Sequence, residues 1–222
     1  MSDPIADKRG RQAMQIARSI GYLSAGSGSI SLIAMTDPER FPAPEVMLQR
    51  LPRGSALIWR AYGENASPSR MRTLAALVRS KGSVLLIAGR PQAGSHIGID
   101  GLHLPERALH RRYENGYVRR AGRSNAHHAV TAACHSEQAI LAAAAAGVDA
   151  VLISPVFPTK SHPEGKPLGI IRFAHLARRA RHLGLTPYAL GGIVNEADVR
   201  RLRGTGTAGV AGISMLVPKL SR

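Results

Sequence analysis

Short apolar segments alternate with longer amphipathic segments along most of the chain. The apolar segments are rich in Val, Ile, Leu and Ala, which is typical of strands that are buried on both faces of a parallel sheet. They cover residues 30–35, 55–59, 84–88, 101–104, 128–133, 150–153, 187–190 and 209–213. The amphipathic segments predict helices over residues 44–51, 68–80, 92–97, 106–113, 136–146, 170–183 and 196–202, with a short tail helix near Met215. Each predicted strand is therefore followed by a predicted helix.

Repeated strand–helix units in a chain of 222 residues predict an α/β fold of the (β/α)₈ TIM-barrel type. A doubly wound open sheet is the alternative. It needs fewer strands, and it usually has a glycine fingerprint after the first strand, where this chain has TDPER at residues 36–40. We therefore expect a single barrel domain over residues 30–222. Residues 1–29 are expected to form an N-terminal extension with an arm and a helix over residues 11–20.

The composition fits one globular domain, since 44% of the residues are hydrophobic. No apolar run approaches the roughly 20 residues of a membrane helix, and the first residues lack the apolar core of a signal peptide. Cys134 is the single cysteine, which excludes an internal disulfide and a cysteine-rich zinc site. These features predict a soluble, cytoplasmic protein.

The chain is strongly basic, with 30 Lys and Arg against 14 Asp and Glu and a formal net charge of +16. Such a charge favours anionic partners. The basic residues are scattered and aromatic residues make up only 4%, so platforms for stacking nucleic-acid bases are scarce. This argues against nucleic acid as the partner, and a phosphorylated small molecule explains the sign of the charge equally well. No membrane partner is expected, and most of the basic residues are interpreted as solvated surface. Association into an oligomer is compatible with the sequence.

Glycines follow the last two predicted strands. Gly191 and Gly192 precede a helix that Asn195 is predicted to cap, and Gly212 is followed closely by Ser214. Barrel enzymes bind ligands at the carboxyl ends of their strands, and phosphate is commonly held after strands seven and eight. Backbone N–H groups at glycines and at a helix N-terminus form anion sites. A tight turn alone is the alternative explanation for the paired glycines.

The segment after the sixth strand, residues 154–169, is rich in Pro, Ser, Thr, Lys and His. Hydroxyls and cations at the carboxyl end of a parallel strand suit an anionic ligand. Its prolines also block regular structure, so an ordinary connecting loop is an equally good interpretation of this segment alone.

Five sequence motifs carry a resemblance to a known family. They are GIDGLHLPER (98–107), AACHSEQA (132–139), VDAVLISPVFPTKSHP (148–163), YALGGI (188–193) and GVAGISML (209–216). In order and spacing they resemble the thiamine phosphate synthase and thiazole tautomerase superfamily, over about residues 31–216. The resemblance implies a TIM barrel that acts in the synthesis of vitamin B1. The synthase joins a pyrimidine methyl diphosphate to a thiazole phosphate with Mg²⁺ and releases diphosphate, whereas the tautomerase isomerises the thiazole.

The resemblance also implies which residues bind the substrates. Arg60 matches the arginine of the motif that holds the pyrimidine diphosphate. The residues implied in binding the thiazole phosphate are Thr159, Ser161, Gly191, Gly192, Gly212, Ile213 and Ser214.

The chain departs from the family pattern where the synthase binds magnesium. Residues 88–89 are Ala-Gly in place of an Asn-Asp pair, and Ala108 replaces the second metal carboxylate. Mg²⁺ is therefore expected from the family, but its ligands are missing, and no spacing marks Asp37, Glu64 or Glu106 as a replacement. Arg60 and neighbouring arginines are an alternative means of neutralising a diphosphate.

Two histidines are candidates for acid–base chemistry. His135 follows the fifth strand and matches the histidine that the tautomerase is thought to use, two residues after Ala133, which replaces a family serine. His162 stands where the family has a lysine, unless Lys160 or Lys166 fills that role, and His103 is expected to pack or to orient a loop on the fourth strand. We therefore expect a protein of the thiamine phosphate synthase family that binds a thiazole phosphate. A tautomerase-like isomerase and a non-catalytic basic barrel that binds anionic partners are the alternatives.

Overall fold

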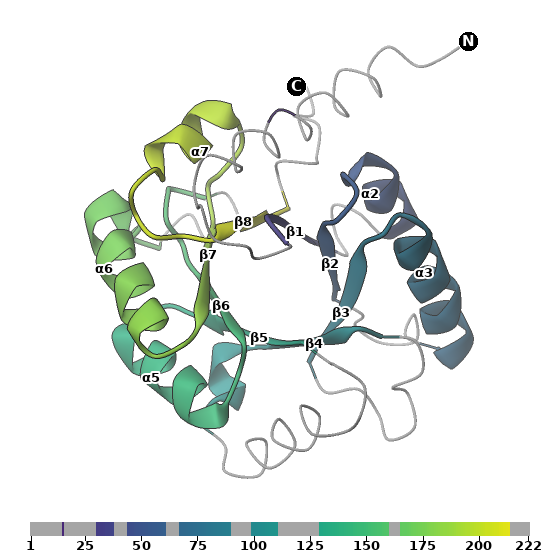
Figure 1. Ribbon diagram of the computed structural model, residues 1–222, viewed down its shortest axis with the longest axis horizontal. Coiled ribbons are helices and arrows are strands. Elements are labelled where there is room, and N and C mark those ends of the chain that lie inside the picture. The colour runs from purple at the N-terminus through teal and green to yellow at the C-terminus, as the bar shows by residue number, and fades with distance from the viewer. Residues whose placement is uncertain are drawn as a thin grey trace.

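The computed structural model describes residues 15, 30–37, 44–60, 67–89, 99–110, 129–159 and 165–213. Its centre is a closed barrel of parallel strands that pair in sequence order, with the last strand pairing with the first (Figure 1). The strands are β1 (Leu32–Met35), β2 (Ala56–Trp59), β3 (Val84–Ala88), β4 (Gly101–Leu104), β5 (Ala129–Cys134), β6 (Ala150–Ile153), β7 (Thr186–Leu190) and β8 (Gly209–Gly212). The predicted TIM-barrel fold is confirmed.

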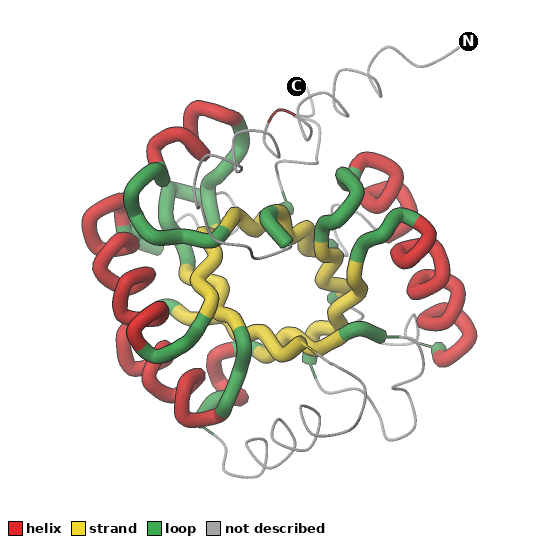
Figure 2. The backbone as a smooth tube through the Cα atoms, viewed as in Figure 1, coloured by secondary structure: helices red, strands yellow, loops and turns green. Residues whose placement is uncertain are grey.

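The helices lie outside the ring of strands, as Figure 2 shows. They are α2 (Pro44–Arg50), α3 (Pro68–Ser80), α5 (Glu137–Ala146), α6 (Gly169–His182) and α7 (Glu196–Arg201). The helix expected over residues 106–113 is wrong in its described part, which is a 3₁₀ turn, η2 (Glu106–Ala108). The N–H of Leu109 bonds to the carbonyl of Glu106, three residues back, so no α-helical hydrogen bond forms there. Of the helix expected over residues 11–20 only Gln15 is described, and it is helical, while the helices expected over residues 92–97 and near Met215 lie outside the described residues.

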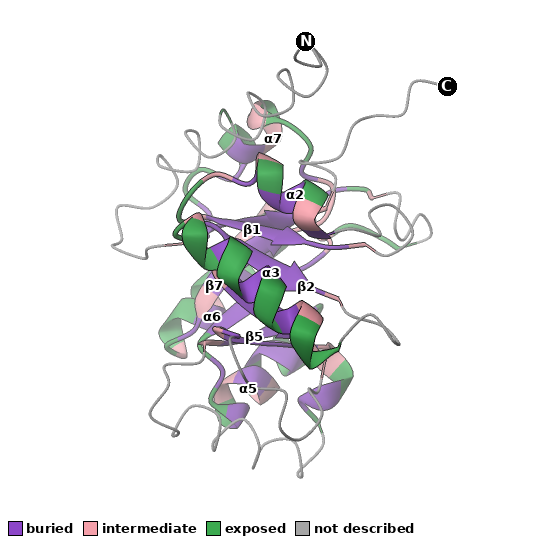
Figure 3. Ribbon diagram, turned by 90° about the vertical axis from the view of Figure 1, so that its right-hand side faces the viewer, coloured by how far each residue is buried: buried purple, intermediate pink, exposed green. Residues whose placement is uncertain are grey.

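Two sets of apolar side chains hold the barrel together. One lies between the strands and the helices, where α3 buries Met71, Leu74 and Val78 at helical spacing and exposes its outer face (Figure 3). The other fills the barrel interior and includes Ile58 and Leu152. Side chains alternate between the two sets along each strand, because successive residues of a strand point to opposite faces. None of the described helices is long and apolar enough to cross a membrane.

Two aspartates close the amino-terminal edge of the barrel in the same way. Asp149, just before β6, accepts the N–H of Val130 at 2.7 Å and donates its own N–H to the Val130 carbonyl at 2.8 Å. Asp100, just before β4, makes the same pair of bonds with Leu85, each at 2.8 Å. Each carboxylate therefore accepts a hydrogen bond from a strand N–H at the position where the hydrogen bonds between neighbouring strands begin.

Replacing Asp149 with alanine is expected to lower the free energy of unfolding by about 1 kcal/mol, because the Val130 N–H loses its acceptor. Urea denaturation measures this change. Asp149→Asn is the matched control, since its amide oxygen accepts the same bond, and it should recover most of the loss. Equal losses in the two variants would contradict a role for the accepted hydrogen bond.

Candidate active site

Polar side chains gather where the strands end, at the carboxyl-terminal mouth of the barrel. Thr36 and Asp37 follow β1, Arg60 follows β2, His135 follows β5 and Ser154 follows β6. Because all the strands are parallel, these residues lie at the same edge of the barrel. This is the edge at which TIM barrels bind their ligands.

His135 is held by residues from two other strand ends. Its backbone N–H donates to Oε2 of Glu106 at 2.7 Å, and its ring Nδ1 lies 2.9 Å from the carbonyl oxygen of Ser154. A carbonyl oxygen only accepts, so Nδ1 carries the proton in the neutral ring and Nε2 keeps its lone pair. The side chain is 55% exposed, and Nε2 lies 4.0 Å from Oε2 of Glu106. The imidazole is thus oriented for proton transfer through Nε2.

The sequence did not predict that Glu106 and Ser154 contact His135. From the sequence, Glu106 is a candidate only for a replacement metal ligand, and Ser154 is only part of a polar loop. Their position one or two residues after a strand was the available signal, because such residues face the mouth of a barrel. The structure instead makes both of them partners of the histidine.

Arg60 is fixed against the end of β1. Its backbone N–H donates to Oγ1 of Thr36 at 2.8 Å, and its Nε donates to the Thr36 carbonyl at 2.5 Å. Nη2 of Arg60 lies 3.4 Å from Oδ2 of Asp37, in an ion pair whose side chains are 24% and 13% exposed. The guanidinium is therefore preorganised, and its positive charge is partly balanced by Asp37.

His103 lies inside the barrel, below this ring of residues. It is 5% exposed, and its Nδ1 lies 2.9 Å from Oγ1 of Thr131 on the neighbouring strand. Burial, and to a lesser degree the charge of Arg60, lowers the pKa of His103 from 6.5 to about 4. The ring is consequently uncharged at neutral pH.

Cys134 is excluded as a nucleophile by its surroundings. The thiol is buried among the apolar side chains between strands and helices. Burial, and then the negative charge of Glu106, raises the pKa of Cys134 to about 12. The reactive thiolate is therefore absent at physiological pH.

The paired glycines form a turn on which the loop after β6 rests. Gly191 and Gly192 have φ values of +95° and +73°, and a β-carbon on Gly192 would lie 2.6 Å from both the Pro158 carbonyl oxygen and Cβ of Phe157. The N–H groups of Val156 and Phe157 donate to the carbonyls of Leu190 and Gly191, at 2.9 and 3.1 Å. The paired glycines therefore do form a tight turn, which was the alternative explanation for them.

The same turn also offers hydrogen-bond donors at the mouth. Within the described part of the chain, no backbone hydrogen bond uses the N–H of Gly191 or Gly192. Unused N–H groups of consecutive residues at a strand end are suited to an anion.

The helix that follows begins with a capping box. Asn195 caps α7 as predicted, because its Oδ1 accepts the N–H of Asp198 at 3.1 Å. Oδ2 of Asp198 in turn accepts the N–H groups of Val194 and Asn195, at 3.0 and 3.3 Å. The cap thus takes up the N–H groups of Val194, Asn195 and Asp198, and a contribution of this helix N-terminus to an anion site stays a prediction.

The other predicted site residues differ in how far the structure describes them. Thr159 is half-buried at the end of the described part of the loop after β6, Gly212 ends β8, and Ile213 follows it. Ser161, His162 and Ser214 lie outside the described residues, so their roles stay predictions.

The described residues do not fit a magnesium site. Ala88, Gly89 and Ala108 stand where the family pattern has its metal-binding pair and carboxylate, and they offer no side-chain oxygen. Of the candidate replacements, Asp37 pairs with Arg60 and Glu106 accepts the His135 N–H, while Glu64 lies outside the described part. In the described ranges, no group of three or more His, Cys, Asp or Glu side chains is placed to hold a metal.

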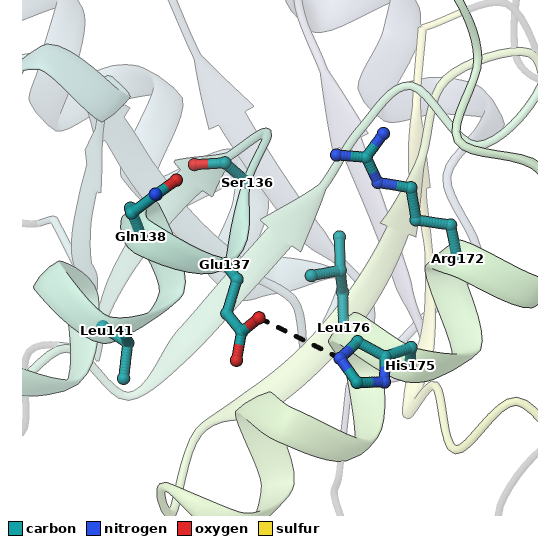
Figure 4. Close-up of a pocket in the computed structure, with 7 residues that line it drawn as sticks. All are labelled: Ser136, Glu137, Gln138, Leu141, Arg172, His175 and Leu176. Carbon is teal, nitrogen blue, oxygen red and sulfur yellow. Dashed lines mark ion pairs between the residues drawn. The ribbon is translucent and has the colours of Figure 1, made fainter.

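A groove of about 390 Å³ lies on the outside of the barrel, between α5 and α6 (Figure 4). Glu137 lies in it, with Oε2 4.0 Å from Nε2 of His175 and Oε1 3.1 Å from Nε of Arg179. Its lining residues are Ser136, Glu137, Gln138, Leu141, Arg172, His175 and Leu176. None of them is a predicted site residue, and the groove lies between helices rather than at the mouth.

Comparison with known proteins now decides the family. The family model described as thiamine monophosphate synthase matches residues 32–216, which include every described strand. The chain belongs to this family.

Relatives in three bacteria agree with the assignment. The chain is 32% identical to a putative thiamine-phosphate synthase 2 of Aquifex aeolicus, over 64% of this chain and 70% of that protein. It is 32% identical to a putative thiamine-phosphate synthase of Geobacter sulfurreducens, over 66% and 68%. It is 34% identical to the thiamine-phosphate synthase of Thermus thermophilus, over 65% and 67%.

Solved structures support the fold. A thiamine phosphate pyrophosphorylase from Pyrococcus furiosus superimposes with a TM-score of 0.63 at 22% identity, over 83% of this chain and 85% of that one. A deoxyribose phosphate aldolase from Aeropyrum pernix superimposes with a TM-score of 0.57 at 16% identity, over 97% and 95%. These two proteins share the barrel fold but have the names of different enzymes, so the chemistry must be inferred from the site.

Proposed function

We propose that this member of the thiamine monophosphate synthase family binds a phosphorylated thiazole at the mouth of the barrel and acts in thiamine synthesis as a transferase. The observation that carries the proposal is the turn at Gly191 and Gly192, whose N–H groups are left without partners among the described residues. A phosphate placed there receives backbone hydrogen bonds at the strand ends where TIM barrels commonly hold phosphate. Thr159 follows in the loop that packs on this turn, and the net charge of +16 draws anions toward the protein.

Isothermal titration calorimetry tests the proposal directly. Purified protein is titrated with the thiazole phosphate, with thiamine phosphate and with inorganic phosphate. We expect both organic phosphates to bind and to bind more tightly than inorganic phosphate, because the ring adds contacts inside the mouth. Absence of binding for both would reject the proposal.

The coupling reaction needs a further test because a diphosphate must leave. Developing negative charge on a leaving group must be neutralised. Among the described residues at the mouth, Arg60 is the cation already oriented for this task. Steady-state coupling is therefore measured with and without a chelator. If the chelator leaves the rate unchanged, neutralisation by arginine is supported. If the chelator abolishes the rate, the reaction requires a metal whose ligands lie outside the described residues.

A second candidate activity, isomerisation of the thiazole, is favoured by the geometry of His135. Its Nδ1 is held by the Ser154 carbonyl, which leaves the Nε2 lone pair available. Nε2 takes a proton from one carbon of the thiazole ligand, and the resulting imidazolium returns it at another carbon, so the composition of the substrate is unchanged. The carboxylate of Glu106, 4.0 Å from Nε2, stabilises the protonated ring between the two steps.

We expect His135→Ala to lower the isomerase rate by about 10²-fold or more, since that is the usual contribution of one acid–base group. Binding of thiazole phosphate, measured by calorimetry, should change little. His175→Ala is the control, because His175 is also largely exposed but lies on α6, away from the mouth. Full turnover in His135→Ala would contradict the assignment.

A further inference from the structure

Charge is distributed unevenly along α6 and α7. Barrel helices run opposite to the strands, so their last turns lie at the amino-terminal edge of the barrel, away from the mouth. The last turns of both helices are rich in arginine. After Glu164 the only acidic residues of the chain are Glu196 and Asp198, and both lie in the first turn of α7. Both acids are therefore toward the mouth, and arginines gather at the opposite edge.

Two arginines of α6 lie against the turn that follows α7. Arg178 and Arg181 are three positions apart, so they lie on the same side of the helix. Nε of Arg181 donates to the Gly206 carbonyl at 2.6 Å, and a β-carbon on Gly206 would lie 3.9 Å from Cγ of Arg178. Arg203 belongs to the same turn, and all three arginines are exposed. We call Arg178, Arg181 and Arg203 the basic edge.

Ion pairs within α7 balance only part of this charge. Nη2 of Arg200 lies 2.6 Å from Oε1 of Glu196, and Nη1 of Arg201 lies 3.8 Å from Oδ1 of Asp198. Among the described residues, none forms an ion pair with Arg178. The last turn of α7 is therefore balanced by its own helix, whereas the positive charge of Arg178 has no described counter-charge.

The surface at the basic edge is open. A β-carbon on Gly204, next to Arg203, would meet no atom within 4 Å. Small ligands are usually held in enclosed sites, whereas an extended anion contacts several cations on an open surface at once. Guanidinium groups also bind phosphate through two parallel N–H donors. The basic edge therefore suits an extended partner that carries many phosphates.

The apolar side chains favour a nucleic acid over a bilayer as that partner. Helices that bind to a bilayer surface insert apolar side chains into it. In the described ranges the exposed large hydrophobic residues are Val46, Leu77, Leu141, Ile171 and Val194. None of them lies in the last turn of α6 or α7. These turns contain no aromatic residue on which bases could stack, but a duplex presents its phosphates on the outside and needs no stacking.

We propose that the basic edge binds the phosphate backbone of double-stranded nucleic acid without reading its sequence. The scarcity of aromatic residues argues against single strands, whose bases stack on such residues, and it does not apply to a duplex. The basic edge and the mouth lie at opposite ends of the barrel. The inference therefore does not depend on the proposed function, and both ligands can be bound at once.

Fluorescence anisotropy tests the proposal with a fluorescein-labelled DNA duplex of about 20 base pairs over a series of KCl concentrations. The logarithm of the association constant should fall linearly with the logarithm of the salt concentration. The slope should be about −3, because each phosphate neutralised by an arginine contributes about −0.9. A second duplex of different sequence should give the same result. Absence of binding at low salt, or an affinity that depends on sequence, would overturn the proposal.

A variant with glutamine at all three positions of the basic edge removes its charge. It should bind the duplex at least about tenfold more weakly at low salt and lose most of the salt dependence. The matched control combines Arg53→Gln, Arg72→Gln and Arg107→Gln, which are also exposed, lie on other elements and remove the same net charge. Its affinity should change less than about twofold. Equal weakening in the two variants would show that only the overall charge matters and would overturn the proposal.

Lysine at the same three positions separates the loss of charge from a loss of structure. This variant keeps the positive charge but not the bond from Arg181 to Gly206, and it should retain the salt dependence. A loss as large as that caused by glutamine would overturn the proposal. Sedimentation with phosphatidylserine vesicles tests the other phosphate surface. Binding to vesicles without binding to the duplex would assign the basic edge to a membrane and overturn the proposal.

Discussion

Replacing Gly192 with alanine is expected to lower the free energy of unfolding by about 3 kcal/mol or more, and to abolish detectable binding of thiazole phosphate. The residue has a φ of +73°, which costs a residue with a β-carbon about 1 kcal/mol or more. The new β-carbon would also lie 2.6 Å from the Pro158 carbonyl oxygen and from Cβ of Phe157. Overpacking of this kind costs about 1–3 kcal/mol. Urea denaturation measures the stability, and calorimetry measures the binding.

The loop after β6 explains why stability and binding should fall together. It is tied to the turn by the bonds from Val156 and Phe157, so relief of the clash requires the loop to move away from Gly191 and Gly192. That movement also shifts Thr159, which follows in the same loop, relative to the turn proposed to receive the phosphate. A variant that is destabilised but still binds thiazole phosphate would show that the phosphate binds elsewhere.

Gly204 provides a matched control for the backbone strain. Its φ is +74°, almost the same as that of Gly192, but a β-carbon there would meet no atom within 4 Å. Gly204→Ala should therefore cost only about 1 kcal/mol and leave binding unchanged. Equal losses of stability in the two variants would mean that the contact with the loop contributes nothing.

The order of the elements could be predicted because apolar strands and amphipathic helices have different periods. The predicted bounds of α3, β3 and β4 agree with the structure to the residue, since proline and glycine mark where these segments begin or end. The cap at Asn195 could be predicted for a similar reason, because capping depends on residues only a few positions apart. Short-range signals of this kind are present in a single sequence.

The contacts of the site could not be predicted, because they join residues that are far apart in the chain. His135 meets Glu106 and Ser154, and Arg60 meets Thr36, across separations of 19 to 29 residues. Which strand end faces which depends on the register of the barrel, and a hydrophobic pattern does not specify that register between strands buried on both faces. The sequence could therefore place His135 and Arg60 at strand ends without identifying their partners.

Acidification is expected to destabilise the protein through His103. The pKa of His103 is about 4 in the folded protein and 6.5 ordinarily, so the unfolded chain binds the proton more readily between these values. The contribution of the neutral ring is fully present above pH 6.5 and is lost as the pH falls toward 4. A shift of this size corresponds to about 3 kcal/mol of unfolding free energy across that interval.

Urea denaturation at a series of pH values, for the unmodified protein and for His103→Phe, isolates this contribution. The variant has no group to titrate at this position, so its stability should fall less steeply between pH 6.5 and 4. Because the slopes are compared, any loss of stability from altered packing that does not depend on pH cancels. Parallel curves for the unmodified protein and His103→Phe would show that the His103 ring is not held neutral in the folded protein.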